Sequence, residues 1–304
     1  MSVAYLAAEG YEAQLQDELA ARGVVITQRH HRLFVSDDAA IDAAWAANIW
    51  FDAQYVAMSS IREAADELRS RQRSWALYAP VHRGRGELIA ARLPHVSAKP
   101  LALGAAAPLA PLGSWTLVAP NVMLVAARCS SAFPNGEPHF IEDHDGPPSR
   151  AYLKLWEAFV RIGRWPQSGE RCLDLGASPG GWTWTLARLG AKVVAIDKAP
   201  LDERLLALSN VTARDESAFS IAPTTFGDVD WLCSDVIAYP KRMYSLVERW
   251  RQSGKARNMI VTLKFQGETD HAIAQAFAAI EGGRVFHLHH NRHELTFVWS
   301  APAS

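Results

Sequence analysis

Cysteine is scarce in this chain of 304 residues, which contains Cys129, Cys172 and Cys233. Three scattered cysteines form neither a disulfide framework nor a zinc site with paired spacing, so we expect a reducing compartment. Long hydrophobic runs are also missing: no apolar stretch approaches the roughly 20 residues that cross a bilayer. The opening residues lack a cationic segment and include Glu9, which is unlike a signal peptide. We therefore expect a cytoplasmic protein with no membrane association.

A strong net charge is absent as well. The formal net charge is −1, and no basic tail indicates a polyanionic partner. This total does not exclude nucleic acid, because a local groove can be cationic in a neutral protein. Hydrophobic residues at 49% and charged residues at 21% are typical of globular proteins and exclude disordered, collagenous and coiled-coil chains.

The amino-terminal half alternates short elements. Apolar spacing predicts a helix over 13–22, strands within 24–36 and a second helix over 41–55. Residues 94–120 are rich in Ala, Pro and Gly and predict an irregular connection, and the runs on either side of Pro120 resemble a hairpin.

A proline-rich acidic segment over 133–148 indicates a boundary near residue 145. It separates an accessory α+β domain, 1–145, from a second domain, 146–304. In the second domain, strands are expected at 171–175, 192–196, 231–234, 259–265, 284–289 and 295–299, and helices at 150–162, 181–189, 239–253 and 270–280. This alternation predicts a Rossmann-like α/β domain, mostly parallel with an antiparallel last strand, whose ligand site lies at the carboxyl ends of the strands. The first helix should bury Tyr152, Leu155, Trp156 and Phe159 and leave Lys154, Glu157 and Arg161 on another face.

A glycine-rich loop, DLGASPGGW over 174–182, follows the first strand of this domain. Glycines let the backbone approach a ligand, and the next helix offers unpaired N–H groups. Asp197 ends the following strand and could hold two ribose hydroxyls. Together these features predict a nucleoside-containing cofactor.

The same loop argues against two other enzyme classes. It matches the G-x-S-x-G pattern of hydrolases, but Pro179 follows the serine and has no N–H for an oxyanion. A dinucleotide fingerprint needs glycine where Ser178 stands, so a nicotinamide-dependent oxidoreductase is the weaker alternative.

LDLGASPGGWT resembles the S-adenosylmethionine motif of the FtsJ-like 2′-O-ribose RNA methyltransferases. Within that family the chain is most similar to the RlmM type, which modifies a cytidine ribose in 23S ribosomal RNA. The shared segments are SRAYLKLWEAF, LDLGASPGGWT, VVAID, WLCSDV, VTLKF and HHNRHELTFVW, which together span nearly all of 149–299. The resemblance implies S-adenosylmethionine as cofactor and RNA, most of all 23S ribosomal RNA, as partner. The implied cofactor residues are Asp174, Gly176, Ser178, Pro179, Gly180, Gly181, Trp182, Asp197 on the ribose hydroxyls, Asp215 near the adenine, and Asp235.

The resemblance also implies a catalytic tetrad of Lys154, Asp235, Lys264 and Glu294. Methyl transfer to a 2′-hydroxyl requires removal of a proton from a weakly acidic alcohol, and a lysine accepts it only in its neutral form. We therefore expect Lys264 to be the base, tuned by Lys154 and positioned by the two carboxylates. A non-catalytic RNA-binding protein with a vestigial site is the alternative outside the enzyme class.

Several clusters of basic residues and histidines lie outside the predicted site. They identify neither the substrate RNA nor the oligomeric state. Two arginine-rich clusters are candidates for RNA contact, one being Arg69, Arg71 and Arg73 with Trp75, Arg83 and Arg85, the other Lys241, Arg242, Arg249, Arg251, Lys255 and Arg257. His287, His289, His290 and His293 suggest a metal, but no cysteine accompanies them and methyl transfer needs none, so we expect no metal. The accessory domain of about 145 residues is short for the RlmM type, which leaves the target nucleotide open.

Overall fold

The computed structural model describes residues 2–302, which divide into two compact units. Unit 1 contains the residues up to 101 together with 107–139, and unit 2 contains 102–106 and the residues from 140 onward. The junction therefore lies a few residues before the boundary expected near 145. The short segment 102–106 joins unit 2, where the backbone of Gly104 lies against Leu189.

Unit 1 is built on a mostly antiparallel sheet. Its elements are β1 (Ser2–Ala7), α1 (Glu12–Ala21), β2 (Ile26–His30), β3 (Leu33–Ser36), β4 (Ala46–Ala57), α2 (Ile61–Arg71), β5 (Trp75–Leu77), α3 (Arg83–Ala90), β6 (Gly113–Ala119), β7 (Val122–Ala126), β8 (Arg128–Cys129) and the 3-10 turn η1 (Pro134–Gly136). The strand order is β2-β3-β1-β4-β7-β6-β5, with β8 on β4. The α+β character expected for this region is confirmed, as is the β6–β7 hairpin.

The helix predicted over 41–55 is wrong, because most of that segment belongs to the long strand β4. Trp45 and Ile49 are four residues apart, a spacing that fits a helical stripe. The backbone of β4 instead pairs with β1, β7 and β8, and these long-range ladders override the local pattern.

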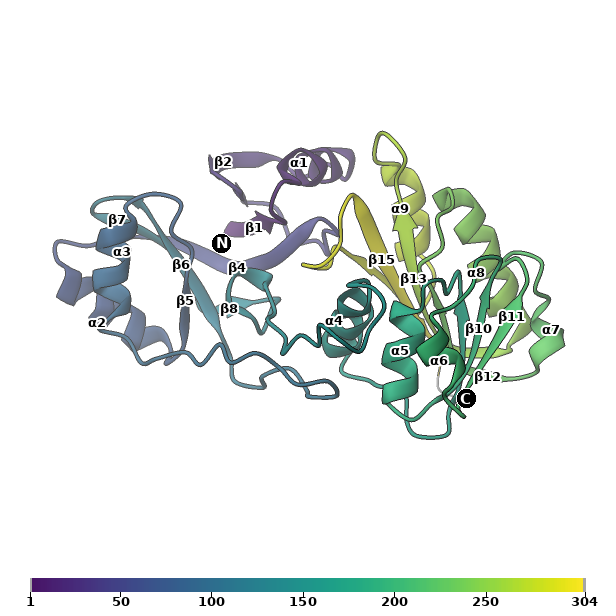
Figure 1. Ribbon diagram of the computed structural model, residues 1–304. Helices are drawn as coiled ribbons and strands as arrows, with labels where there is room; N and C mark the ends of the chain where they lie inside the picture. Colours follow the sequence, from purple (N-terminus) through teal and green to yellow (C-terminus); the bar gives the residue numbers. More distant parts are fainter. Residues whose placement is uncertain (1, 303–304) are drawn as a thin grey trace. The chain divides into compact units, whose positions relative to one another are not determined.

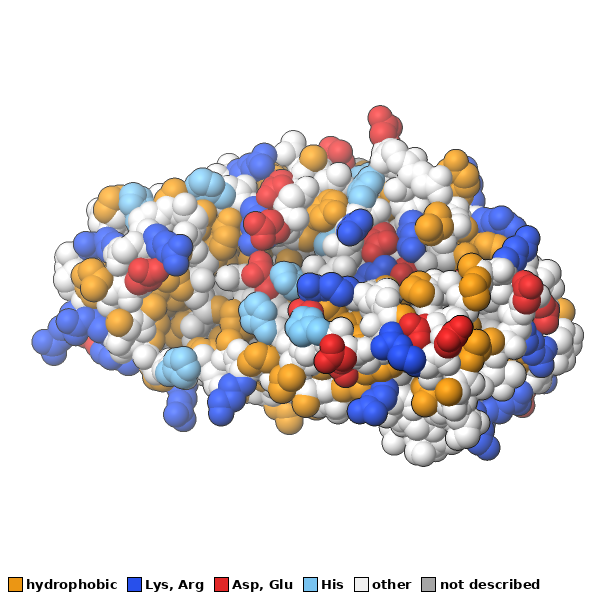
Figure 2. Space-filling view, in the orientation of Figure 1, with side chains coloured by type: hydrophobic (Ala, Val, Ile, Leu, Met, Phe, Trp, Pro, Cys, Tyr) orange, Lys and Arg blue, Asp and Glu red, His pale blue; other side chains and the backbone are white. Residues whose placement is uncertain are grey.

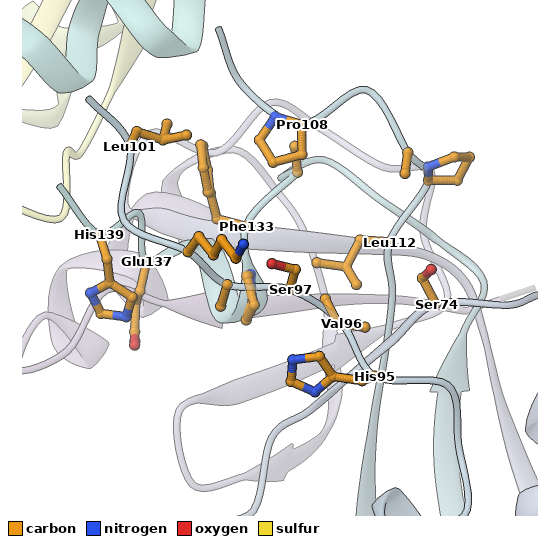
Figure 3. A pocket seen from close by; sticks show the side chains of 16 residues that line it. Ser74, His95, Val96, Ser97, Leu101, Pro108, Leu112, Phe133, Glu137 and His139 are labelled. Atoms are coloured by element: carbon orange, nitrogen blue, oxygen red, sulfur yellow. The ribbon is translucent and has the colours of Figure 1, made fainter. Parts of the chain in front are cut away.

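A cavity of about 290 Å³ lies in unit 1 beside the irregular segment before β6 (Figure 3). Most of its wall is apolar and includes Val96, Leu112 and Phe133, while His95 and His139 are among its polar residues. None of the residues predicted to bind cofactor or to act in catalysis lines it, so the site must be sought in unit 2.

Unit 2 is a doubly wound α/β domain. Its elements are α4 (Tyr152–Ile162), β9 (Arg171–Leu175), α5 (Gly181–Arg188), β10 (Lys192–Asp197), α6 (Glu203–Leu206), β11 (Val211–Asp215), α7 (Pro223–Phe226), β12 (Val229–Ser234), α8 (Pro240–Ser253), β13 (Ala256–Lys264), α9 (His271–Ala278), β14 (Gly283–Phe286) and β15 (Glu294–Ser300). The strand order is β11-β10-β9-β12-β13-β15-β14, and β15 alone runs antiparallel to both of its neighbours. The predicted fold class is confirmed.

Helices cover both faces of this sheet, with α4, α5 and α6 on one and α8 and α9 on the other (Figure 1). The central strands β9, β12 and β13 are almost fully buried, as their apolar sequences require. Their carboxyl ends share one edge, and the antiparallel β15 enters the sheet at that same edge. This topology brings together residues that are far apart in sequence.

Candidate active site

Four charged side chains converge at the carboxyl edge of the unit 2 sheet. Lys154 projects from α4, Asp235 follows β12, Lys264 ends β13 and Glu294 begins β15. Nζ of Lys154 lies 2.9 and 2.7 Å from the two carboxylate oxygens of Asp235 and 3.0 Å from Oε1 of Glu294. Lys264 and Glu294 are directly opposed in the β13–β15 pair. The structure thus brings together all four residues of the expected tetrad.

The two lysines have different electrostatic surroundings. Burial by itself would lower the pKa of Lys154, but the attraction of Asp235 and Glu294 outweighs it and raises this pKa. Nζ of Lys264 donates to the backbone oxygen of Asp235 at 2.6 Å and lies 3.1 Å from its Oδ1. The side chain of Lys264 is 20% exposed, against 11% for Lys154. Lys154 therefore remains an ammonium that holds two carboxylates, and Lys264 is the more accessible of the pair.

The glycine loop between β9 and α5 leaves no room for side chains at two positions. Gly176 and Gly180 have φ values of +79° and +118°, a region that favours glycine. A Cβ on Gly180 would collide with Leu205, and one on Gly176 would lie 2.6 Å from Cβ of Val236. The bare backbone of this loop and the first turn of α5 can therefore approach a ligand closely.

Asp197 and Asp215 end the neighbouring strands β10 and β11 and lie opposite each other in register. The carboxylate of Asp197 accepts hydrogen bonds from the N–H groups of Ser178 and Ala199, each at 3.0 Å. It therefore ties the glycine loop to the end of β10. Each of its oxygens can accept a second bond, which is the capacity that a ribose diol requires.

Asp174 is a fully buried carboxyl at the end of β9. Its Oδ2 accepts a hydrogen bond from the Thr183 hydroxyl at 2.6 Å, and its Oδ1 has no partner among the described residues. Burial raises the pKa of Asp174 to about 7, although the bond from Thr183 opposes the rise. An unpartnered acceptor beside the glycine loop, together with a carboxylate that can accept further hydrogen bonds, fits a nucleoside-containing cofactor.

The side chains of two residues in the glycine loop form hydrogen bonds within the protein. The Trp182 side chain is 3% exposed in the apolar core, and its Nε1 donates to the carbonyl of Ala151 at 2.9 Å. The ring of Trp182 thus packs against α4, and the contact of this residue with cofactor stays a prediction. The Ser178 hydroxyl donates to the carbonyl of Pro200 at 2.8 Å.

Glu157 was expected on a helix face other than the buried apolar one, and it is itself completely buried. Its carboxylate accepts bonds from the N–H groups of His289 and His290 and contacts Nδ1 of His290, at 2.9 to 3.1 Å. It also pairs with Arg161 at 2.7 Å. Glu157 therefore fixes the loop that leads into Glu294. Only its spacing of one helical turn from Lys154 hinted at this in the sequence.

The burial of Glu157 predicts a loss of stability in acid. Although burial opposes ionisation, the attraction of Arg161 and the bonds from His290 and His289 lower its pKa to about 2. A carboxyl group with a lower pKa in the folded state than in the unfolded state stabilises the fold. The full effect is present at pH values above the unfolded pKa, and it is lost as the pH falls to the folded pKa. The window here is about pH 4.5 down to 2, and the contribution is about 3 kcal/mol.

Urea unfolding at several pH values tests this expectation, with Glu157→Gln as the comparison. The wild type should lose more stability than the variant between pH 5 and pH 3. The buried His287, whose pKa burial lowers to about 4 against the opposing attraction of Glu157, also titrates in this window and contributes to both proteins. Parallel pH profiles would contradict the role given to Glu157.

The histidines do not form a metal site within residues 2–302, where no group of three or more His, Cys, Asp or Glu side chains is arranged to hold a metal ion. His287 contacts the carbonyl of Arg292 at 3.0 Å, and His293 contacts the Thr269 hydroxyl at 2.8 Å. These bonds order the segment before β15.

The two basic clusters are less continuous than the sequence suggested. Trp75 is 5% exposed and its indole N–H bonds to the carbonyl of Leu68, so this ring is not available for the RNA contact expected of its cluster. In the second cluster, Lys255 and Arg257 follow the carboxyl end of α8 and each forms an ion pair with an aspartate. About 20 Å of helix separates them from Lys241, which lies at the start of α8. Basic and acidic side chains are interspersed over the face in Figure 2. Within residues 2–302, no helix has the length and hydropathy needed to span a membrane.

Residues 147–269 match the FtsJ-like methyltransferase family. This segment holds the glycine loop, Asp197 and three of the four tetrad residues. Residues 147–269 are an FtsJ-like methyltransferase domain. The fourth member, Glu294, lies beyond the matched segment of the FtsJ-like domain and is joined to it through the β13–β15 pair.

Several curated proteins that match this chain are named ribosomal RNA large subunit methyltransferase M. A ribosomal RNA large subunit methyltransferase M of Thauera aminoaromatica is 33% identical over 56% of this chain and 50% of its own length. One of Cellvibrio japonicus is 40% identical over 44% of this chain and 39% of its own. The chain spans about half the length of the curated relatives that it matches. Similarity to solved structures is lower: magnesium protoporphyrin IX methyltransferase of Synechocystis shares 15% identity and a TM-score of 0.38 over 50% of this chain and 79% of that one.

Proposed function

We propose that this protein transfers a methyl group from S-adenosylmethionine to a ribose 2′-hydroxyl of RNA, with 23S ribosomal RNA as the substrate class and the cytoplasm as its location. The observation that carries the proposal is the Lys154–Asp235–Lys264–Glu294 cluster beside the glycine loop of an FtsJ-like domain. Relatives named for large-subunit ribosomal RNA support the substrate class.

The cofactor would be held by the loop from Gly176 to Gly181 and by the carboxylates around it. Asp197 is suited to the ribose diol, and the unpartnered Oδ1 of Asp174 to a polar group of the cofactor. Asp215, which lies opposite Asp197, would contact the adenine end of the cofactor, and Asp235 would contact the end nearest the tetrad. S-adenosylmethionine would supply an electrophilic methyl group, so no metal is needed.

Proton removal would fall to Lys264. Lys154 is bound by two carboxylates that stabilise its charged form, which makes it a poor proton acceptor. Lys264 is the more accessible amine of the two and pairs with Asp235, so it would be the one that reaches the 2′-hydroxyl. Asp235 and Glu294 would fix the direction of both lysines and compensate the positive charge that forms when Lys264 takes the 2′-hydroxyl proton.

Unit 1 would serve as an accessory RNA-binding domain. The nicotinamide alternative is weaker, because Ser178 occupies the position where a dinucleotide fingerprint needs glycine. A vestigial site is disfavoured because the four charged residues form one connected network.

Calorimetry and labelled methyl transfer test the proposal in sequence. We expect the protein to bind S-adenosylmethionine and to bind NAD at least 100-fold more weakly. It should then transfer tritiated methyl groups to ribosomal RNA from a strain that lacks the gene, and mapping of 2′-O-methylation should find one nucleotide restored. Binding of cofactor without transfer to any RNA would contradict the proposed activity.

A further inference from the structure

The loop between β12 and α8 carries two exposed apolar side chains next to the tetrad. Ile237 is 77% exposed and Tyr239 is 65% exposed, while Ala238 and Pro240 are buried. This alternation places Ile237 and Tyr239 on the outward side of the loop. Large apolar groups side by side in water add little to the stability of the fold, so a binding role is the simpler explanation.

The loop is fixed at its start by the tetrad itself. The backbone oxygen of Asp235 accepts a bond from Lys264 at 2.6 Å, and its carboxylate is bound by Lys154. Val236 then packs against the backbone of Gly176. Tyr239 follows Asp235 by four residues, which span at most about 14 Å of chain. The exposed pair therefore lies no farther than this from Asp235, which Lys264 contacts at 3.1 Å.

Positive charge lies on the same side of the domain. Lys241 and Arg242 open α8 directly after the loop, and both are exposed. Neither forms an ion pair with a carboxylate among residues 2–302, unlike Lys255 and Arg257 at the other end of this helix. The guanidinium of Arg242 lies 3.7 Å from the centroid of the Phe219 ring, which holds its plane in place. Apolar side chains flanked by unpaired cations suit a nucleotide, whose base is apolar on its faces and whose phosphate is anionic.

We propose that Ile237 and Tyr239 form a stacking platform for the unpaired base of the nucleotide that is methylated. This inference rests on the proposed function, since it uses the position of Lys264 at the reacting ribose. A base inside a duplex has both faces covered by its neighbours, so a base that stacks on Tyr239 must be unpaired. Stacking on a phenol ring accepts any base, so the platform selects single-stranded RNA and leaves sequence choice to other contacts.

Binding of two defined RNA probes tests the platform. The first is a single-stranded 12-mer that contains 2-aminopurine, a base whose fluorescence is quenched by stacking, and the second is a 12-base-pair duplex. Tyr239→Ala should weaken binding of the single strand about tenfold and remove the quenching, within the range of 1–3 kcal/mol per stacked base. Tyr239→Trp should restore both, because it keeps an aromatic face.

Three further measurements separate the alternatives. Leu206→Ala, which removes an exposed side chain of the same unit, should leave RNA binding unchanged. Affinity for S-adenosylmethionine should be equal in all variants, which shows that the site remains folded.

Unchanged single-strand affinity in Tyr239→Ala would overturn the proposal and leave a protein segment as the occupant of the platform. Equal losses for single strand and duplex would overturn it too. A wild type that binds the single strand with quenching and transfers no methyl group would reject the proposed function instead.

Discussion

Lys264→Ala is expected to abolish methyl transfer and to leave S-adenosylmethionine binding intact. The variant lacks the accessible amine that faces Asp235, and general-base catalysis contributes about 10²- to 10⁴-fold to a rate. Lys154 does not take its place, because two carboxylates hold Lys154 in its charged form. Tritiated methyl transfer measures the activity, and calorimetry measures the cofactor affinity.

A charge-conserving variant separates proton transfer from electrostatic binding. Lys264→Arg keeps the positive charge, but a guanidinium does not give up its proton in this pH range, so it too should be inactive. Lys192→Ala, at the opposite end of the sheet, removes an exposed lysine and should retain full activity. Activity of Lys264→Ala or Lys264→Arg within tenfold of the wild type would reject Lys264 as the base.

Lys154→Met is expected to reduce both stability and activity. Methionine keeps the length of the side chain but leaves Asp235 and Glu294 without the cation they share. Breaking a buried ion pair on one side costs about 3–5 kcal/mol, because the remaining charge stays desolvated. Urea unfolding at pH 7.5 should show this loss, and methyl transfer should fall because the carboxylates no longer hold their geometry.

A second substitution identifies the cause. Asp235 keeps its contact with Lys264 in Lys154→Met, whereas Glu294 loses the ammonium that lies 3.0 Å from its Oε1. Removing the charge of Glu294 in the double variant Lys154→Met/Glu294→Gln should therefore restore part of the lost stability. Lys255→Met, which breaks an exposed pair with Asp228, should cost less than about 1 kcal/mol. Equal stability of the single and double variants would indicate lost packing rather than unpaired charge.

Local sequence was enough to predict most elements of unit 2. The strands β9 and β10 and the helices α5 and α8 agree with their predicted ranges to within two residues. The strands have apolar or β-branched sequences that suit the buried sheet, and the helices have an apolar stripe that packs on it. The strand β11 was missed because its residues are largely exposed and polar, so its sequence carries no apolar period. In unit 1, β4 was misassigned because its state depends on partners that lie far away along the chain.

The sequence by itself determined the glycine loop, most of the strands and helices of unit 2 in their order, and the chemical types available to the site. Tertiary structure alone decided that Glu157 is buried as the anchor of the His289–His290 loop, and that Trp75 and Trp182 belong to cores. It also decided which lysine is held by two carboxylates and which by one. The physical reason is that burial and electrostatic coupling depend on distances between elements remote in sequence, and a linear pattern records only what each element can offer.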